Sequence, residues 1–117
     1  MSYAFVDWNE IEPYRGTLRR IRRELGISAF GVNLHEMPPH ADDYPDHSET
    51  VTDQEELYIC LEGDGTITID GDEVELKSGR CVFVTPESRR KIVAGARGLR
   101  CLAIGTPSGS YRGWENL

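Results

Sequence analysis

From Ile27 onward, hydrophobic and polar residues alternate with a period of two over most of the chain. Runs of this kind are typical of β-strands that bury one face. The pattern predicts strands at residues 29–34, 57–61, 66–69, 73–76, 81–84, 92–94 and 99–104. Short strands at such regular spacing indicate an antiparallel sandwich or barrel, which places the chain in the all-β class.

Glycine, proline and aspartate separate these predicted strands. Turns are expected at residues 63–65, at 77–79 and at 95–98, because each of these stretches contains glycine. Asp70-Gly71 has the composition of a tight type I′ hairpin. Pro86 is expected to end the strand at 81–84.

The first 27 residues follow another pattern. Apolar residues recur every three positions, which predicts a short helical turn lying on the barrel: Phe5, Trp8, Ile11 and Tyr14. A helix is then expected from a capping Thr17 to Leu25, followed by Gly26. Its arginines should point mainly to solvent. The binding of an acidic partner, such as a second subunit, is the alternative for this basic segment, Arg15 to Arg23.

We therefore divide the chain into three parts. Residues 1–27 form an N-terminal segment that packs on the barrel, and residues 28–105 form the barrel itself. Residues 106–117 form a tail rich in glycine and serine, which we expect to pack across the surface through Tyr111 and Trp114.

Two stretches resemble the two motifs of the cupin superfamily. In the first, His47-Ser48-Glu49 stands where the family has His-x-His, and Glu56, followed after six residues by Gly63, matches the rest. In the second, which begins at Gly79, Arg90 stands at the position of a ligand histidine. The chain thus resembles a small single-domain cupin with a degenerate metal motif. The resemblance implies a jelly-roll β-barrel, or double-stranded β-helix, with a short N-terminal helix.

The resemblance also implies a site inside the barrel. In a metal-binding interpretation, His47, Glu49 and Glu56 would hold a divalent ion, with water in the open positions. One imidazole and two carboxylates are a harder ligand set than the three histidines and one glutamate usual in the family. They favour Mn²⁺, Fe²⁺ or Mg²⁺, with Ni²⁺ and Zn²⁺ as further candidates. An open ion of this kind would act as a Lewis acid or bind dioxygen.

Arg90 argues against a metal, because a guanidinium is always charged and repels a cation. It is expected to pair with Glu49 or Glu56 instead. We therefore expect no cofactor. In a metal-free cavity, Arg90 and His47 would hold a small, anionic molecule. Tyr58 and His47 would serve as an acid–base pair, by analogy with metal-free sugar-epimerase cupins. A core role for Tyr58 is the alternative.

Other residues are assigned to structure. His35 and His40 flank the break at 37–39, and both are expected on the surface or in a loop. Phe83 or its neighbours are expected to form an apolar wall of the cavity. The three cysteines are expected to be small buried thiols: Cys60, Cys81 and Cys101. Cys60 has the same strand parity as Glu56, so it is a candidate to line the cavity.

The length and the charge distribution of the chain exclude some classes of function. The 117 residues form one domain, with a formal net charge of −7. Between Arg23 and Lys77 there are fifteen acidic residues and no lysine or arginine. This distribution argues against nucleic-acid binding. No apolar run approaches the length of a membrane helix, and no secretory signal is visible, so we expect a cytoplasmic protein. We also expect a homodimer, because dimers are the commonest closed oligomers.

The leading functional hypothesis is a small-molecule-binding cupin with a His/Glu/Arg cluster in place of the metal site. Its ligand-binding residues would be His47, Glu49, Glu56, Tyr58 and Arg90. A divalent-metal-dependent cupin enzyme of the oxygenase or isomerase type is the first alternative. A structural or regulatory module with a filled barrel is the second. Whether the protein is an enzyme stays open at this stage.

Overall fold

Two long antiparallel strands, β3 (Gln54–Ile69) and β6 (Arg90–Pro107), form the centre of the fold. The second half of β6 pairs on its other side with β2 (Gly31–Met37). The second half of β3 pairs with β4 (Asp72–Lys77), and the first half pairs with β5 (Cys81–Val84).

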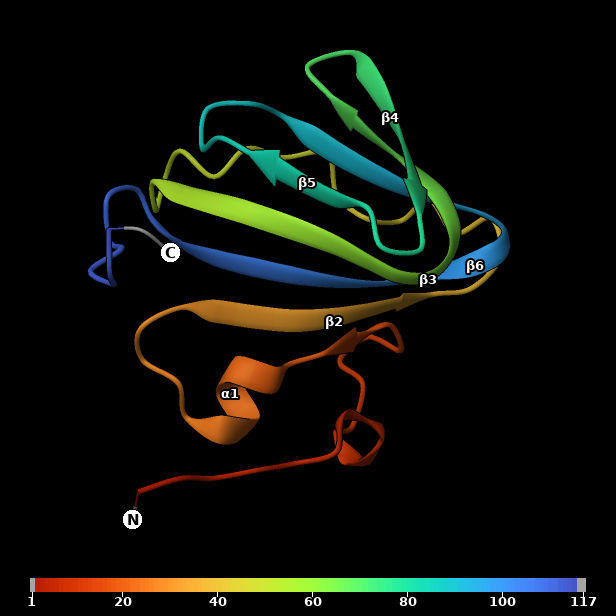
Figure 1. The fold of residues 1–117 in the computed structure, drawn as a ribbon. Coiled ribbons are helices and arrows are strands. Elements are labelled where there is room, and N and C mark those ends of the chain that lie inside the picture. The colour runs from red at the N-terminus through yellow and green to blue at the C-terminus, as the bar shows by residue number, and fades with distance from the viewer. Residues whose placement is uncertain (1, 116–117) are drawn as a thin grey trace.

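The computed structural model describes residues 2–115. The strands form one six-stranded sheet in the order β1–β2–β6–β3–β4, with β5 beside β3. Figure 1 shows β3 and β6 bending together at one end, so that the sheet folds back over itself in two layers. The all-β barrel with a short N-terminal helix is confirmed.

The bend lies where the sequence predicted turns, and that prediction was wrong at two places. The residues at 63–65 do not separate two strands, because β3 continues through them. The residues at 95–98 likewise lie inside β6, which replaces the two short strands expected at 92–94 and 99–104.

Glycine allows this bend because two backbones approach each other too closely for side chains. Gly63 has a φ of +89°, and a Cβ atom there would lie 2.1 Å from the carbonyl oxygen of Gly98. Across the step from Gly63 to Gly65, the partner residue in β6 moves from Leu99 to Ala94. The glycines therefore form a bulge that bends the strands without ending them.

Two of the predicted turns are confirmed. Asp70 and Gly71 have φ angles of 49° and 90°, the two positive values that a type I′ hairpin between β3 and β4 requires. Gly79 has a φ of 86° in the turn that enters β5, which ends before Pro86 as expected.

The N-terminal segment is less helical than predicted. It contains a 3₁₀ turn, η1 (Trp8–Glu10), a two-residue strand, β1 (Leu18–Arg19), and a short helix, α1 (Ile21–Leu25). Thr17 is not the helix cap, because Leu18 pairs with His35 of β2 and holds this stretch extended. Figure 1 shows the segment beside β2, at the edge of the sheet.

Arg19 also differs from the prediction that these arginines face solvent. Its guanidinium pairs with Glu36 and donates to the carbonyl oxygen of Ile11 at 2.7 Å. Arg100 of β6 donates to the same carboxylate at 3.0 Å. Arg19 therefore ties the N-terminal segment to β2 and β6.

The core fills the space between the two layers. Its members come from the loop before β3 and from β2 through β6: Met37, Tyr44, Tyr58, Cys60, Ile67, Leu76, Val82, Val84, Ile92, Ala94, Leu99, Cys101 and Ala103. Cys60 and Cys101 face each other across β3 and β6, and burial raises the pKa of Cys101 to about 12. Cys60 is a core residue and does not line the cavity described below.

Four exposed residues correct earlier expectations. Cys81 and Phe83 are exposed, since β5 turns Val82 and Val84 inward, so Phe83 forms no wall of the cavity. In the tail, Tyr111 and Trp114 are exposed instead of packed on the barrel. Residues 116–117 lie outside the described part of the chain. Among the described residues, no helix is both long and apolar enough to cross a membrane.

Candidate functional site

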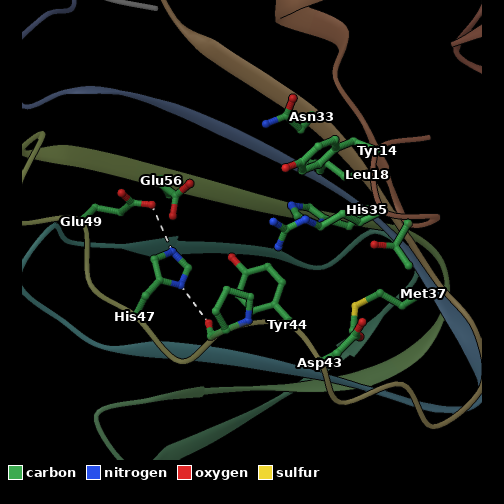
Figure 2. Close-up of a pocket in the computed structure, with 13 residues that line it drawn as sticks. Tyr14, Leu18, Asn33, His35, Met37, Asp43, Tyr44, His47, Glu49 and Glu56 are labelled. Atoms are coloured by element: carbon green, nitrogen blue, oxygen red, sulfur yellow. Dashed lines mark hydrogen bonds and ion pairs between the residues drawn. The ribbon is translucent and has the colours of Figure 1, made fainter. Parts of the chain in front are cut away.

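A cavity of about 530 Å³ opens between β2, the loop before β3 and the N-terminal segment. Figure 2 shows its lining side chains converging from these elements. The lining is mixed polar and apolar: Tyr14, Arg15, Thr17, Leu18, Asn33, His35, Met37, Asp43, Tyr44, Pro45, His47, Glu49 and Glu56. The barrel is therefore not filled by side chains at this end. Such concave sites are where small molecules bind most often.

The loop between β2 and β3 supplies five of the thirteen lining residues, and backbone hydrogen bonds fix it to the barrel. His47 and Arg90 exchange backbone hydrogen bonds of 3.0 and 2.8 Å as an isolated bridge. The backbone N–H of Glu49 donates to the carbonyl of Pro86 at 2.8 Å. These bonds hold the His47 and Glu49 side chains over the start of β6.

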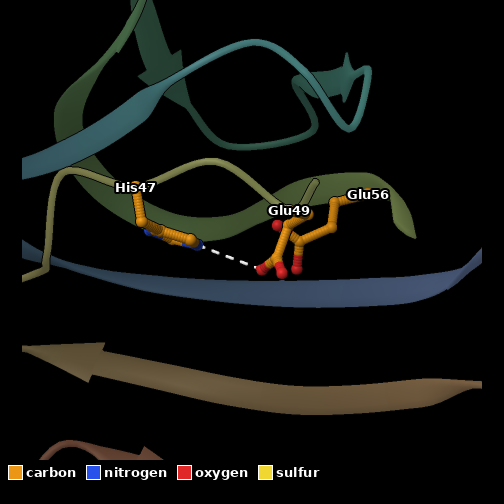
Figure 3. Close-up of side chains that lie close together, drawn as sticks. All are labelled: His47, Glu49 and Glu56. Carbon is orange, nitrogen blue, oxygen red and sulfur yellow. Dashed lines mark hydrogen bonds and ion pairs between the residues drawn. The ribbon is translucent and has the colours of Figure 1, made fainter. Parts of the chain in front are cut away.

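His47, Glu49 and Glu56 are brought together, as the sequence suggested. Their potential ligand atoms all lie within 4.8 Å of one another (Figure 3). His47 Nε2 lies 3.1 Å from Glu49 Oε1, and His47 Nδ1 lies 2.9 Å from the carbonyl oxygen of Pro45. Both partners can only accept, so a ring with a proton on each nitrogen makes both bonds and a neutral ring makes one.

Arg90 does not reach the cavity but lies directly behind it. It is fully buried, and its Nη1 donates to Glu56 Oε1 at 2.5 Å while Nη2 donates to the carbonyl of Thr85 at 2.7 Å. Its Nε has no partner among the described residues. The sequence predicted that Arg90 would pair with Glu49 or Glu56, and the partner is Glu56.

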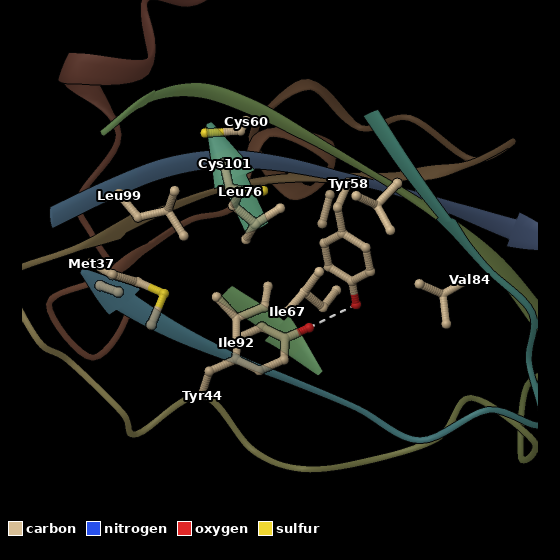
Figure 4. Packing of buried hydrophobic residues seen from close by; sticks show 13 residues of the cluster. Met37, Tyr44, Tyr58, Cys60, Ile67, Leu76, Val84, Ile92, Leu99 and Cys101 are labelled. Atoms are coloured by element: carbon tan, nitrogen blue, oxygen red, sulfur yellow. Dashed lines mark hydrogen bonds between the residues drawn. The ribbon is translucent and has the colours of Figure 1, made fainter. Parts of the chain in front are cut away.

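Tyr58 also lies behind the cavity, and it continues the network from Glu56. Its hydroxyl donates to Glu56 Oε1 at 2.7 Å. It also forms a hydrogen bond of 2.8 Å with the hydroxyl of Tyr44, which is drawn within the core in Figure 4. Burial raises the pKa of both tyrosines far above the ordinary value. Tyr58 is fully buried, so it cannot touch a ligand in the cavity and is a core tyrosine with a polar partner.

Glu56 is subject to opposing influences. Burial raises its pKa, and so does the nearby Glu49 carboxylate, while the Tyr58 hydroxyl and the Arg90 guanidinium favour the ionised form. A neutral Glu56 would leave the buried charge of Arg90 without a counter-charge. We therefore treat Glu56 as ionised at neutral pH.

His35 lines the cavity, although the sequence predicted it on the surface or in a loop. It lies on β2 with Asn33 and Met37, which share its strand parity and also line the cavity. Burial, together with the nearby His47, lowers the pKa of His35 to about 4, so it is neutral at physiological pH. The alternation of β2 was the signal that could have placed it here, but the strand was predicted to end at residue 34.

Tyr44 was missed for a different reason, because its loop has no regular period. Its ring contacts both imidazoles, with centroid distances of 5.2 Å to His35 and 5.5 Å to His47. It therefore fixes the positions of both rings in the cavity (Figure 2).

The donor set does not fit the metal centre that the fold implies. One nitrogen and two carboxylates converge, but Glu56 Oε1 already accepts from Arg90 and Tyr58. The guanidinium supplies the positive charge that an ion would bring, from the position of a ligand histidine. A cation bound by Glu49 and His47 would stand next to that charge. The three side chains therefore do not form a metal centre of the family's kind.

Comparison with known proteins decides the family. A family model for the cupin domain matches residues 33–105. The chain belongs to the cupin family. The expectation from the two motifs is thus confirmed.

Two known proteins match this cupin over different lengths. It is 35% identical over 115 residues to dimethylsulfoniopropionate lyase DddW of Ruegeria pomeroyi, covering 97% of this chain and 66% of that protein. It is 34% identical over 64 residues to an uncharacterized protein of Methanocaldococcus jannaschii, covering 54% of this chain and 51% of that one. The chain thus spans between half and two thirds of these relatives.

Among solved structures, a cupin protein from Bacteroides fragilis superposes with a TM-score of 0.84 at 26% identity. That match covers 99% of this cupin and 93% of the other chain. The N-terminal segment is therefore part of a shared architecture and not an appendage to the barrel.

Proposed function

We propose that this protein is a small-molecule-binding cupin in which the buried Arg90–Glu56 ion pair takes the place of a metal centre. The observation that carries the proposal is the guanidinium itself, which is fully buried and bonded to Glu56 at 2.5 Å. The ligand would occupy the cavity in front of this pair. His47, Glu49 and His35 are among the polar groups that it would meet there.

The chemistry that this arrangement supports is proton transfer. Glu49 offers a carboxylate at the cavity wall, and His47 lies 3.1 Å from it, where it can orient the carboxylate or relay a proton. Glu56 is engaged by Arg90 and Tyr58, so it acts as a fixed negative charge. His35, neutral and next to Tyr44, is a hydrogen-bonding group for the ligand.

The first experiment separates this proposal from a metalloprotein. The protein is purified without chelator or affinity tag and its bound Mn, Fe, Ni and Zn are measured, alongside the His47→Ala variant. We expect less than one tenth of an equivalent of any metal. Near-stoichiometric metal that is lost in the variant would overturn the proposal.

The second experiment looks for the ligand. A library of small polar molecules is screened by thermal shift against the wild type, Glu49→Gln and the exposed control Glu87→Gln. We expect hits whose stabilisation is lost in Glu49→Gln and kept in Glu87→Gln. Hits that respond equally to both changes would place the binding site elsewhere.

A lyase is a second candidate, which the 35% identity to dimethylsulfoniopropionate lyase favours. In such an elimination, Glu49 would take the proton from the carbon next to the carboxylate. The carbon–sulfur bond would break, the sulfur would leave with the bonding electrons as neutral dimethyl sulfide, and a carbon–carbon double bond would form. His47 would pass the proton from Glu49 to solvent.

Gas chromatography tests the lyase directly. The purified protein is incubated with dimethylsulfoniopropionate, and dimethyl sulfide is measured in the headspace. A lyase should release it with the wild type and at least 100-fold more slowly with Glu49→Gln. A rate equal to that of the protein-free sample would remove this candidate and leave the binding proposal standing.

A further inference from the structure

Arg15 lines the cavity from a tight hairpin in the N-terminal segment. Tyr14 and Leu18 form its base by exchanging backbone hydrogen bonds of 2.7 and 3.1 Å. Thr17 fastens it to β2 through a bond of 2.7 Å from the N–H of Glu36 to its carbonyl. The hairpin thus holds its tip at the edge of the cavity.

Arg15 and Gly16 form the tip as a tight turn, which the N–H of Thr17 closes by donating to the carbonyl of Tyr14 at 3.3 Å. Their φ angles are 54° and 79°, the same pair of positive values as in the type I′ turn at Asp70 and Gly71. Glycine adopts such angles freely, but they are uncommon for a long side chain.

Among the described residues that line the cavity, Arg15 alone is an arginine or lysine. Its guanidinium makes no hydrogen bond or ion pair with any residue between 2 and 115, and its nearest aromatic contact is the Tyr14 ring at 5.2 Å. Arg90, by contrast, forms an ion pair with Glu56 behind the cavity wall. The sequence predicted that Arg90 would bind an anion in the cavity. In the structure Arg15 is the arginine that is placed to do so.

The remaining charges of the lining are acidic. Asp43, Glu49 and Glu56 all border the cavity, and only Glu56 has a buried cation against it. A simple anion that reached Arg15 would be repelled by the other two carboxylates. A molecule with a positive group at its other end would be attracted to them, and Tyr44 adds an aromatic ring to the lining.

We infer that Arg15 binds the carboxylate of a small zwitterionic ligand, whose cationic end lies toward Glu49 and Tyr44. This inference rests on the proposed function, since it names the ligand class of the same cavity. Arg15 is then the specificity-determining residue of the site. Its position also gives the N-terminal segment a role beyond covering the sheet edge.

The test measures binding of three probes by isothermal titration calorimetry: β-alanine betaine, its carboxamide and propionate. The trimethylammonium group is a poor leaving group, so binding is measured without turnover. We expect the wild type to bind the betaine at least tenfold more tightly than the carboxamide or propionate. Arg15→Ala should abolish the preference for carboxylate over carboxamide, and Arg15→Lys should retain part of it.

Arg20→Ala is the matched control. Its guanidinium lies over the same Tyr14 ring, at 4.3 Å, but does not line the cavity. It should therefore leave the preference unchanged. A preference that survives in Arg15→Ala, or equal binding of betaine and carboxamide by the wild type, would overturn the inference.

The outcome also separates this inference from the proposed function. If the betaine fails to bind but the thermal-shift screen finds ligands of another charge class, the zwitterion inference falls and the proposed function stands. If the screen finds no ligand at all, both fall.

Discussion

At the scale of single residues, the pairing of Arg90 with Glu56 determines most of the site. Two buried charges cost much desolvation, and their attraction repays it only when the geometry is good. Here one carboxylate oxygen accepts from both the guanidinium and the Tyr58 hydroxyl. Removing one partner leaves the other charge buried alone, which is far costlier than losing a surface pair.

We predict that Arg90→Met lowers the free energy of unfolding by about 3–5 kcal/mol, because Glu56 is left buried without its partner. The double change with Glu56→Gln should recover a large part, since the amide oxygen still accepts from Tyr58. Urea unfolding measures both. The control is Arg89→Met, an exposed residue paired with Asp46 at 3.2 Å, which should cost less than about 1 kcal/mol. Equal losses for Arg89 and Arg90 would contradict the argument.

His35 predicts a pH dependence of stability. Its pKa is about 4 in the folded protein and 6.5 ordinarily, so the unfolded chain binds the proton more readily between these values. Stability contributed by the neutral ring is complete above pH 6.5 and falls toward pH 4, by up to roughly 3 kcal/mol. Chemical unfolding at several pH values measures this.

His35→Gln should flatten the curve between pH 6.5 and 4, because glutamine does not titrate there. His40→Asn is the control, since His40 is exposed and its φ of 62° suits asparagine. It should leave the curve unchanged. A wild-type slope that persists in His35→Gln would assign the effect to other groups.

At the scale of elements, the bulge between β3 and β6 turns a flat pair of strands into two layers. Inward residues of β3 have even numbers at Tyr58 and Cys60 but an odd number at Ile67. β6 changes parity in the same place, from Ile92 to Leu99. With strict alternation, the inward residues of a strand would keep the same parity along its whole length. An extra residue in a bulge changes the parity, so that both halves of the strand keep their apolar side chains toward the core.

Gly63 and Gly71 allow a matched test of this close approach. Their φ angles are +89° and +90°, but a Cβ at Gly63 would meet the Gly98 carbonyl at 2.1 Å, whereas nothing lies within 4 Å at Gly71. Alanine at Gly71 should cost about 1–2 kcal/mol from the backbone alone. Alanine at Gly63 should cost about 1–3 kcal/mol more, because the strands must separate. Urea unfolding measures both, and equal losses would contradict the bulge.

At the scale of the whole molecule, the N-terminal segment extends the sheet at β2 (Figure 1). Its residues Tyr14, Arg15, Thr17 and Leu18 also line one side of the cavity. Its first residues, however, leave apolar side chains in solvent: Tyr3 is 75% and Phe5 86% exposed. Two large aromatic residues so close together are candidates for a contact with a second copy. The homodimer expected from the sequence remains a prediction, and this segment is where we place its interface.

We predict a mass of twice the 13.2 kDa chain by light scattering after size exclusion. The double change Tyr3→Ser with Phe5→Ser should shift the protein toward the monomer, because it removes the apolar contact. Val51→Ser, at a 97% exposed position outside the N-terminal segment, is the control and should not change the mass. A wild-type monomer at high concentration would refute the dimer.

Much of this protein follows from the sequence alone, because strand alternation and turn composition are local. The all-β class, the Asp70–Gly71 hairpin and the end of the strand before Pro86 were all predictable in this way. The two motifs, through their resemblance to the cupins, also brought His47, Glu49 and Glu56 together. Arg90 was correctly expected to pair with a carboxylate, since a guanidinium seeks one wherever it is buried.

Only the tertiary structure decided the rest, because it depends on contacts between distant segments. Glycine is common both in turns and in bulges, so the local sequence does not distinguish the two. The contact between Gly63 and Gly98 in the folded protein shows that β3 and β6 are continuous strands with a bulge. The extended stretch at β1 depends on pairing with β2, which local helix propensity does not include. His35 and Arg15 become cavity residues because that pairing brings the N-terminal hairpin beside β2. The walls of the site therefore form only when distant segments of the chain pack together. Its central residues, two glutamates and one histidine, could be predicted from the sequence.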